Sequence, residues 1–136
     1  AYTFEPKIKI NEKVALVKYH PGYNPDLLKN IIDSGYKAII FEGTGLGHIG
    51  KNMYPVIKIA KEKGIFMGMT SQCIDGRVRM TVYESGRDLL NLGITPLENM
   101  ISEIALVKAM WITGNTEKYD EIKENMLNEI ASEFTT

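Results

Sequence analysis

Short apolar runs alternate with stretches of helical periodicity through the first half of the chain. Strands are expected where β-branched and apolar residues run together, at residues 14–19, 38–41 and 65–69. Helices are expected between them, from Asn24 or Pro25 to Gly35 and over residues 53–63, each closed by a glycine. This β-α-β-α-β order predicts a three-layer α/β fold, a mostly parallel sheet with helices on both faces, of the flavodoxin or Rossmann kind.

The second half is more polar at first and then helical. Residues 78–83 alternate well enough for a fourth strand or an extended segment, and residues 85–92 have a helical pattern that ends at Gly93. Residues 96–113 and 117–134 predict two amphipathic helices, the first capped by Ser102 or Asn99. Trp111 and the methionines at helical spacing are expected in the core.

Composition indicates one ordinary globular domain. The chain has 136 residues, of which 44% are hydrophobic and 24% are charged. A net charge of -1 disfavours a free-standing nucleic-acid binder, and no apolar run reaches the length of a membrane helix. Cys73 is the single cysteine, which fits a cytoplasmic protein. Residues 1–12 resemble a linker that follows a missing N-terminal domain, and residues 13–136 form the expected domain.

A glycine loop directly follows the most apolar predicted strand, residues 38–41. Its glycines are Gly43, Gly45, Gly47 and Gly50. Ligands of open α/β sheets bind outside the carboxyl ends of the strands, so this loop is the default site. The GxGxGxxG spacing matches neither the dinucleotide fingerprint nor the P-loop. We therefore expect no cofactor.

A second polar segment, Thr70, Ser71, Gln72 and Cys73, follows the next strand and should reach the same edge of the sheet. His48 is either a loop or interface histidine or a contact to substrate or another chain, whereas His20 is locked in a turn by Pro21. No cysteine or histidine pair has the spacing of metal ligands. These residues form a rim without the nucleophile, base and oxyanion donor that catalysis requires.

Several separated motifs point to one family. TSQC (70–73), GRV (76–78), VYESGR (82–87) and EIALVKAMW (103–111) occur together in this order. With VALVKYHPG and GYKAIIFEGTGLGH before them, they closely resemble the C-terminal domain of the asparaginase family. Within that family the chain is most similar to the D subunit of the archaeal-type glutamyl-tRNA(Gln) amidotransferase.

The resemblance implies an amidohydrolase whose catalytic residues, a nucleophilic threonine with a second threonine, an aspartate and a lysine, lie in a larger N-terminal domain. The smaller domain would pack against that domain of a neighbouring subunit in a homodimer and close its active site. No catalytic residue is expected here. Leu46 stands where bacterial periplasmic asparaginases have a substrate-contacting asparagine, and Glu84 or Tyr83 falls near a glutamate that they supply. The expected substrate or interface rim comprises Gly43, Thr44, Gly45, Leu46, Gly47, His48, Ser71, Gln72, Cys73, Tyr83 and Glu84.

Two functional classes remain open at this point. As part of an amidotransferase D subunit, the domain would help to release ammonia for a partner subunit that amidates glutamate on tRNA, with a cytoplasmic asparaginase domain as the rival within the class. The other class is a stand-alone module that binds a small ligand. The first predicts exposed apolar surface where a missing domain docks, and the second predicts a closed monomer.

Overall fold

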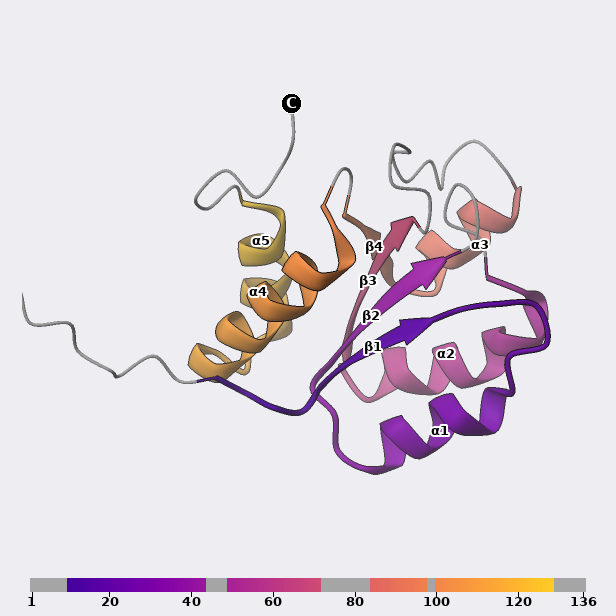
Figure 1. The fold of residues 1–136 in the computed structure, drawn as a ribbon, viewed down its shortest axis with the longest axis horizontal. Helices are drawn as coiled ribbons and strands as arrows, with labels where there is room; N and C mark the ends of the chain where they lie inside the picture. The colour runs from indigo at the N-terminus through magenta and orange to yellow at the C-terminus, as the bar shows by residue number, and fades with distance from the viewer. Residues whose placement is uncertain (1–9, 44–48, 72–83, 98–99, 129–136) are drawn as a thin grey trace, which may run out of the picture.

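The computed structural model describes residues 10–43, 49–71, 84–97 and 100–128. Its strands are β1 (Val14–Lys18), β2 (Ala38–Gly43), β3 (Phe66–Ser71) and β4 (Ile94–Pro96), which form one parallel sheet in the order β1-β2-β3-β4. Its helices are α1 (Pro25–Asp33), the short 3-10 helix η1 (Lys51–Met53), α2 (Tyr54–Glu62), α3 (Glu84–Asn91), α4 (Ser102–Asn115) and α5 (Tyr119–Leu127). Figure 1 shows their arrangement.

The central strand β2 supplies both halves of the core. Successive side chains of a strand point to opposite faces, and β2 is apolar at every position from Ala38 to Phe41. Ile39 and Phe41 pack with α1, α2 and α3, whereas Ala38 and Ile40 pack with α4 and α5. Helices therefore cover both faces of the sheet (Figure 1), which confirms the predicted three-layer α/β class.

The described strands follow one another in chain order, so the strand order does not reverse within this described sheet. In flavodoxin and Rossmann sheets the binding crevice forms where that reversal occurs. The described sheet therefore shares with those folds only the common edge from which the loops after parallel strands leave.

Local sequence signals explain the ends of α1. The Asn24 side chain accepts a hydrogen bond from the Asp26 backbone N–H (3.0 Å), and Pro25 occupies the first helical position. Gly35 follows the helix with a φ of 84°, a left-handed conformation that glycine adopts without steric cost. The helix bounds predicted from these residues agree with the structure.

The strand β4 was not predicted from the sequence. Residues from Pro96 onward were expected to begin a helix, but Pro96 pairs with Met69 of β3 and α4 begins only at Ser102. The strand is three residues long, which is too short to show alternation. Proline is tolerated there because β4 is the last strand of the sheet formed by the described residues and pairs on its β3 side only among them. The alternative fourth strand, residues 78–83, lies outside the described residues.

Helix α4 corrects the prediction for Trp111. Its sheet-facing residues Ala105, Ala109 and Ile112 are buried, whereas Trp111 is 41% exposed and lies on the opposite side of the helix from the core. The exposed apolar residues Ile101, Ile104, Val107 and Trp111 lie on or directly before α4, and we call them the α4 outer stripe. The core prediction for the methionines at helical spacing is correct for Met53, Met100 and Met126, whereas Met110 is only partly buried.

The last predicted helix is shorter than its pattern suggested. Helix α5 begins at Tyr119 and ends at Leu127, because Asn128 has an extended backbone. Residues 129–134 of the predicted helix lie outside the described part of the chain. Among the helices described, none has both the length and the apolar character needed to cross a bilayer.

Candidate functional site

The carboxyl ends of β2 and β3, from which the two predicted loops start, are paired with each other. Gly43 and Ser71 are register partners at the last pair of the β2–β3 ladder. The segments that continue from them, 44–48 and 72–73, therefore start from the same edge of the sheet, as the sequence predicted for parallel neighbouring strands. Figure 1 shows the arrowheads of these strands pointing to the same end of the sheet.

Glu84 is the first residue of α3, the helix between β3 and β4 in chain order. Figure 1 places α3 beside the end of the sheet to which the strand arrowheads point. The structure thus pairs the backbones of Gly43 and Ser71 at the carboxyl edge and places the helix that begins at Glu84 beside it. The other predicted rim residues, Thr44, Gly45, Leu46, Gly47, His48, Gln72, Cys73 and Tyr83, lie outside the described residues.

The end of β1 contributes aromatic residues that sequence reasoning did not place at the site. Tyr19 is buried, and its backbone N–H donates to the Glu42 carbonyl oxygen (2.9 Å). The Tyr23 ring meets the His20 ring edge-on, with centroids 5.5 Å apart. Burial raises the pKa of the Tyr23 hydroxyl. The Tyr23 backbone N–H donates to the His20 carbonyl oxygen (3.0 Å), which agrees with the turn predicted for His20.

Tyr19 also determines which residue can stand at the end of the glycine loop. A Cβ atom placed on Gly50 would lie 2.5 Å from the Tyr19 hydroxyl oxygen and 2.9 Å from Asn52 Oδ1. Side chains do not approach so closely, so a larger residue at position 50 would require Tyr19 and Asn52 to move. No short-range sequence signal could have revealed this contact.

A carboxylate beside the glycine loop is linked to the beginning of α4. The Ser102 hydroxyl lies 3.2 Å from Glu42 Oε2 and 2.9 Å from Glu103 Oε1. Ser102 was predicted as a possible N-cap, but Ile101 occupies the cap position and no side chain makes a capping hydrogen bond there. Ser102 instead joins α4 to the residue that precedes Gly43. The alternative cap, Asn99, lies outside the described residues.

The described part of the edge offers hydrogen-bonding and acidic groups. The Thr70 hydroxyl is buried and donates to the Phe41 carbonyl oxygen (3.3 Å), so it joins β3 to β2. Within the described ranges, no three histidine, cysteine, aspartate or glutamate side chains gather as metal ligands would.

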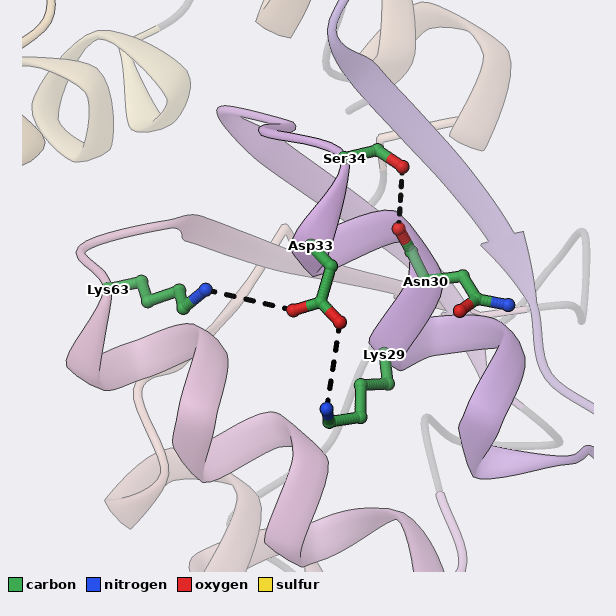
Figure 2. Close-up of polar contacts among 5 residues, drawn as sticks. All are labelled: Lys29, Asn30, Asp33, Ser34 and Lys63. Carbon is green, nitrogen blue, oxygen red and sulfur yellow. Dashed lines mark hydrogen bonds and ion pairs between the residues drawn. The ribbon is translucent and has the colours of Figure 1, made fainter.

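A cavity of about 470 Å³ lies at the opposite, amino edge of the sheet. Its lining includes Asp33, Tyr36, Lys63, Thr116 and Glu117. Figure 2 shows Asp33 between Lys29 and Lys63, at distances of 3.6 Å and 3.8 Å, with all three side chains about half exposed. A second hollow of about 330 Å³ lies beside β4 and α5. Neither of these two hollows is lined by the described rim residues Gly43, Ser71 or Glu84.

Comparison with known proteins gives consistent matches. The family model described as the glutaminase/asparaginase C-terminal domain matches residues 13–126. The D subunit of the glutamyl-tRNA(Gln) amidotransferase from Sulfolobus acidocaldarius is 50% identical over 126 residues, and the one from Pyrococcus abyssi is 48% identical over 127 residues. Each match covers 93% of this chain but only 28% and 29%, respectively, of the relative's length.

Solved structures agree with these matches. The thermostable L-asparaginase from Thermococcus kodakarensis is similar with a TM-score of 0.84 and 32% identity, and L-asparaginase I from Vibrio cholerae with 0.84 and 25%. Both comparisons cover 94% of this chain and 39% of the asparaginase chain. The motifs, the three-layer fold and the family match lead to one conclusion. This chain belongs to the glutaminase/asparaginase C-terminal domain family.

Proposed function

We propose that this chain is the C-terminal domain of an amidohydrolase and that its carboxyl edge completes the active site of a catalytic domain on a neighbouring subunit. The observation that carries the proposal is the extent of the match. Half of the aligned residues are identical to the D subunit of an amidotransferase across 93% of this chain, yet the match spans only 28% of that relative. The rest of such a protein is available to hold the catalytic residues.

The geometry of the edge fits a role in binding. Gly43 and Ser71 are paired, and Glu84 begins the helix that follows. The main-chain groups of the predicted glycine loop and the carboxylate expected from Glu84 would suit the amide and α-amino groups of a small amino acid such as asparagine or glutamine. In the reaction, water replaces the side-chain amide nitrogen, which leaves a carboxylate and ammonia. This chain would orient the substrate, and the nucleophile would come from the other domain.

Within this class we favour a D-subunit parent over an L-asparaginase. Identity is 50% to the Sulfolobus acidocaldarius amidotransferase D subunit and 32% to the Thermococcus kodakarensis L-asparaginase over similar shares of this chain. Ammonia released in such a protein would pass to a partner subunit that amidates glutamate on tRNA(Gln). The α4 outer stripe also disfavours a closed stand-alone module, because such a module predicts a surface without an apolar patch.

A hybrid enzyme tests the proposal. This chain would replace the matched segment of the Sulfolobus acidocaldarius D subunit, which would be produced with the other subunits of its amidotransferase. We expect ammonia release from glutamine or asparagine by the hybrid and none by this chain alone. Activity of the isolated chain would overturn the proposal, since the chain would then hold its own catalytic residues.

A substitution within the hybrid tests the proposed rim. Glu84→Ala should lower kcat/KM for amide hydrolysis by about tenfold or more, because the site would lose a substrate-orienting group, while the melting temperature stays nearly constant. Glu62→Ala, at an exposed glutamate of α2, is the matched control and should leave the rate unchanged. An unaltered rate for Glu84→Ala would remove Glu84 from the site.

A further inference from the structure

Helix α4 is apolar on both of its sides. Ala105, Ala109 and Ile112 face the sheet and are buried, whereas the α4 outer stripe faces away with exposures between 40% and 63%. A helix at the surface of a domain normally has a polar outer side. A helix that is apolar all round is typical of an element covered from both directions.

The outer side of α4 also has almost no charge. Its exposed residues are Glu103, Ile104, Val107, Trp111 and Asn115, of which only Glu103 is charged. Lys108 is turned inward and is only 8% exposed, whereas Val107 beside it is 63% exposed. Isolated exposed apolar residues are common on protein surfaces, but here they recur at helical spacing along one line. An exposed apolar line that includes a tryptophan suits a helix that contacts another protein surface.

The path of the chain points to what covers the stripe. The Asn11 backbone N–H donates to the Met110 carbonyl oxygen (2.9 Å), so the chain enters the domain beside the end of α4 that carries Trp111. Figure 1 shows this entry next to α4. Ile10, the first described residue, is itself 57% exposed. Any polypeptide that precedes residue 10 is therefore tethered close to the α4 outer stripe, at a high effective concentration.

The relatives supply such a polypeptide. The matched family model is described as a C-terminal domain, and the match leaves about 70% of each D-subunit relative outside it. We propose that the α4 outer stripe is the docking surface for the domain that precedes this one in the same polypeptide. This inference rests on the proposed function for the existence of that domain. It assigns the carboxyl edge to the neighbouring subunit and the α4 outer stripe to the chain's own preceding domain.

Trp111 is a built-in reporter, because it is the only tryptophan of the chain. We would incorporate 5-fluorotryptophan into the isolated chain and into the hybrid D subunit, and assign the Trp111 fluorine signal from its loss in Trp111→Phe. The proposal predicts that a soluble paramagnetic probe broadens this signal in the isolated chain and several-fold less in the hybrid. Equal broadening in both proteins would overturn it.

Substitutions separate docking from folding. Val107→Glu should restore probe access to Trp111 in the hybrid and lower its melting temperature, while the melting temperature of the isolated chain stays within about 2 °C. Val107→Gln introduces a polar group without a charge and should have the same effect on probe access and melting temperature to a smaller extent. It serves as the second variant if Val107→Glu does not fold. Leu27→Glu is the matched control, because Leu27 is 51% exposed on α1 and lies on the other face of the sheet. An equal effect of Leu27→Glu would overturn the proposal.

The main rival occupant is a second copy of this chain. Sedimentation of the isolated chain at several concentrations should show a monomer. A dimer that Val107→Glu dissociates would assign the stripe to self-association and overturn the proposal. Ammonia release distinguishes the docking inference from the proposed function. A hybrid that protects Trp111 but hydrolyses amides under no condition contradicts the proposed function alone. An active hybrid in which Trp111 is fully accessible contradicts the docking surface alone.

Discussion

The ammonium group of Lys108 donates a hydrogen bond to the Met126 carbonyl oxygen at 3.1 Å and another to the Asn128 carbonyl oxygen. These carbonyls lie at the C-terminal end of α5, where the last turn has no intrahelical donors and no basic residue of its own. A cation from α4 thus satisfies acceptors of α5 and lies at the negative end of its dipole. This contact explains why a lysine is buried in an otherwise apolar layer.

Replacing Lys108 should destabilise the domain strongly. Lys108→Met keeps the packing of the stem but leaves the Met126 and Asn128 carbonyl oxygens without this donor, so we expect a loss of about 2–3 kcal/mol in the free energy of unfolding. Urea denaturation followed by circular dichroism measures it. Lys58→Met, at an exposed position of α2, is the control and should change stability by less than about 0.5 kcal/mol. A loss below about 1 kcal/mol for Lys108→Met would contradict the capping role.

Lysine side chains also donate hydrogen bonds to carbonyl oxygens at the C-terminal ends of two other helices. Helices α1, α3 and α5 have no basic residue in the last turn. Lys13 Nζ donates to the Ser34 carbonyl oxygen (3.3 Å) after α1, and Lys61 Nζ donates to the Asn91 carbonyl oxygen (2.9 Å) at the end of α3. Both lysines are exposed, unlike Lys108. Because water competes with exposed hydrogen bonds, their removal should cost less than that of Lys108.

The ion pairs around Asp33 should contribute little. Asp33 lies between Lys29 and Lys63 (Figure 2), but all three side chains are about half exposed and Asp33 is at the unfavourable, negative end of α1. We expect Asp33→Asn to change the free energy of unfolding by no more than about 0.5 kcal/mol at low salt. The difference should disappear in about 1 M sodium chloride because salt screens exposed charges. A salt-resistant loss above about 1 kcal/mol would show that this pair is structural.

Stability should fall at alkaline pH partly through Tyr119. Burial, and then the Asp120 carboxylate, raise the pKa of its hydroxyl above the ordinary 10.0. The unfolded chain therefore loses this proton at a lower pH than the folded chain. Stability is fully present below about pH 10 and declines as the pH rises from there through the folded pKa.

Tyr119→Phe removes this ionisable hydroxyl, so part of the loss of stability at alkaline pH should disappear. The variant should be less stable than the parent by about 1 kcal/mol near neutral pH, because the hydroxyl donates to the Gly93 carbonyl oxygen (3.4 Å). The difference in the free energy of unfolding between the parent and the variant should narrow as the pH rises above about 10. Tyr23 and Tyr54 also have raised pKa values, so a decline should remain in the variant. If urea titrations show that the stability difference between the two proteins widens as the pH rises, the raised pKa of Tyr119 is contradicted.

The sheet was predictable because its signals are local. β2 is apolar from Ala38 to Phe41 and ends at Gly43, and the helices on one face of the sheet are followed by glycines with positive φ. The shared edge of Gly43 and Ser71 then follows from parallel pairing alone. β4 gave no comparable signal, because three residues that end in proline cannot show a period.

The orientation of α4 could not be read from its sequence. EIALVKAMW is apolar at nearly every position, so periodicity does not identify a buried side. Tertiary packing determines which side of α4 is buried. Ala105 and Ala109 face the sheet, where their small side chains allow a close approach, and Trp111 remains on the exposed side. Contacts between distant residues, such as Tyr19 with Gly50 or Ser102 with Glu42, likewise have no sequence signature.

The space around Gly50, which the Tyr19 hydroxyl limits, can be tested directly by substitution. Gly50→Ala places a methyl group 2.5 Å from the Tyr19 hydroxyl oxygen, so Tyr19 or the loop must move, and we expect a loss of about 1–3 kcal/mol in the free energy of unfolding. Tyr19→Phe removes the hydroxyl and carries its own cost, since Tyr19 makes other polar contacts. In the double variant the next atoms are Asn52 Oδ1 at 2.9 Å and the Tyr19 ring carbon at 3.6 Å. The cost of Gly50→Ala should therefore be smaller by about 1 kcal/mol in the Tyr19→Phe background than in the parent. Additive costs in this double-mutant cycle would show that Asn52, and not the Tyr19 hydroxyl, requires glycine at position 50.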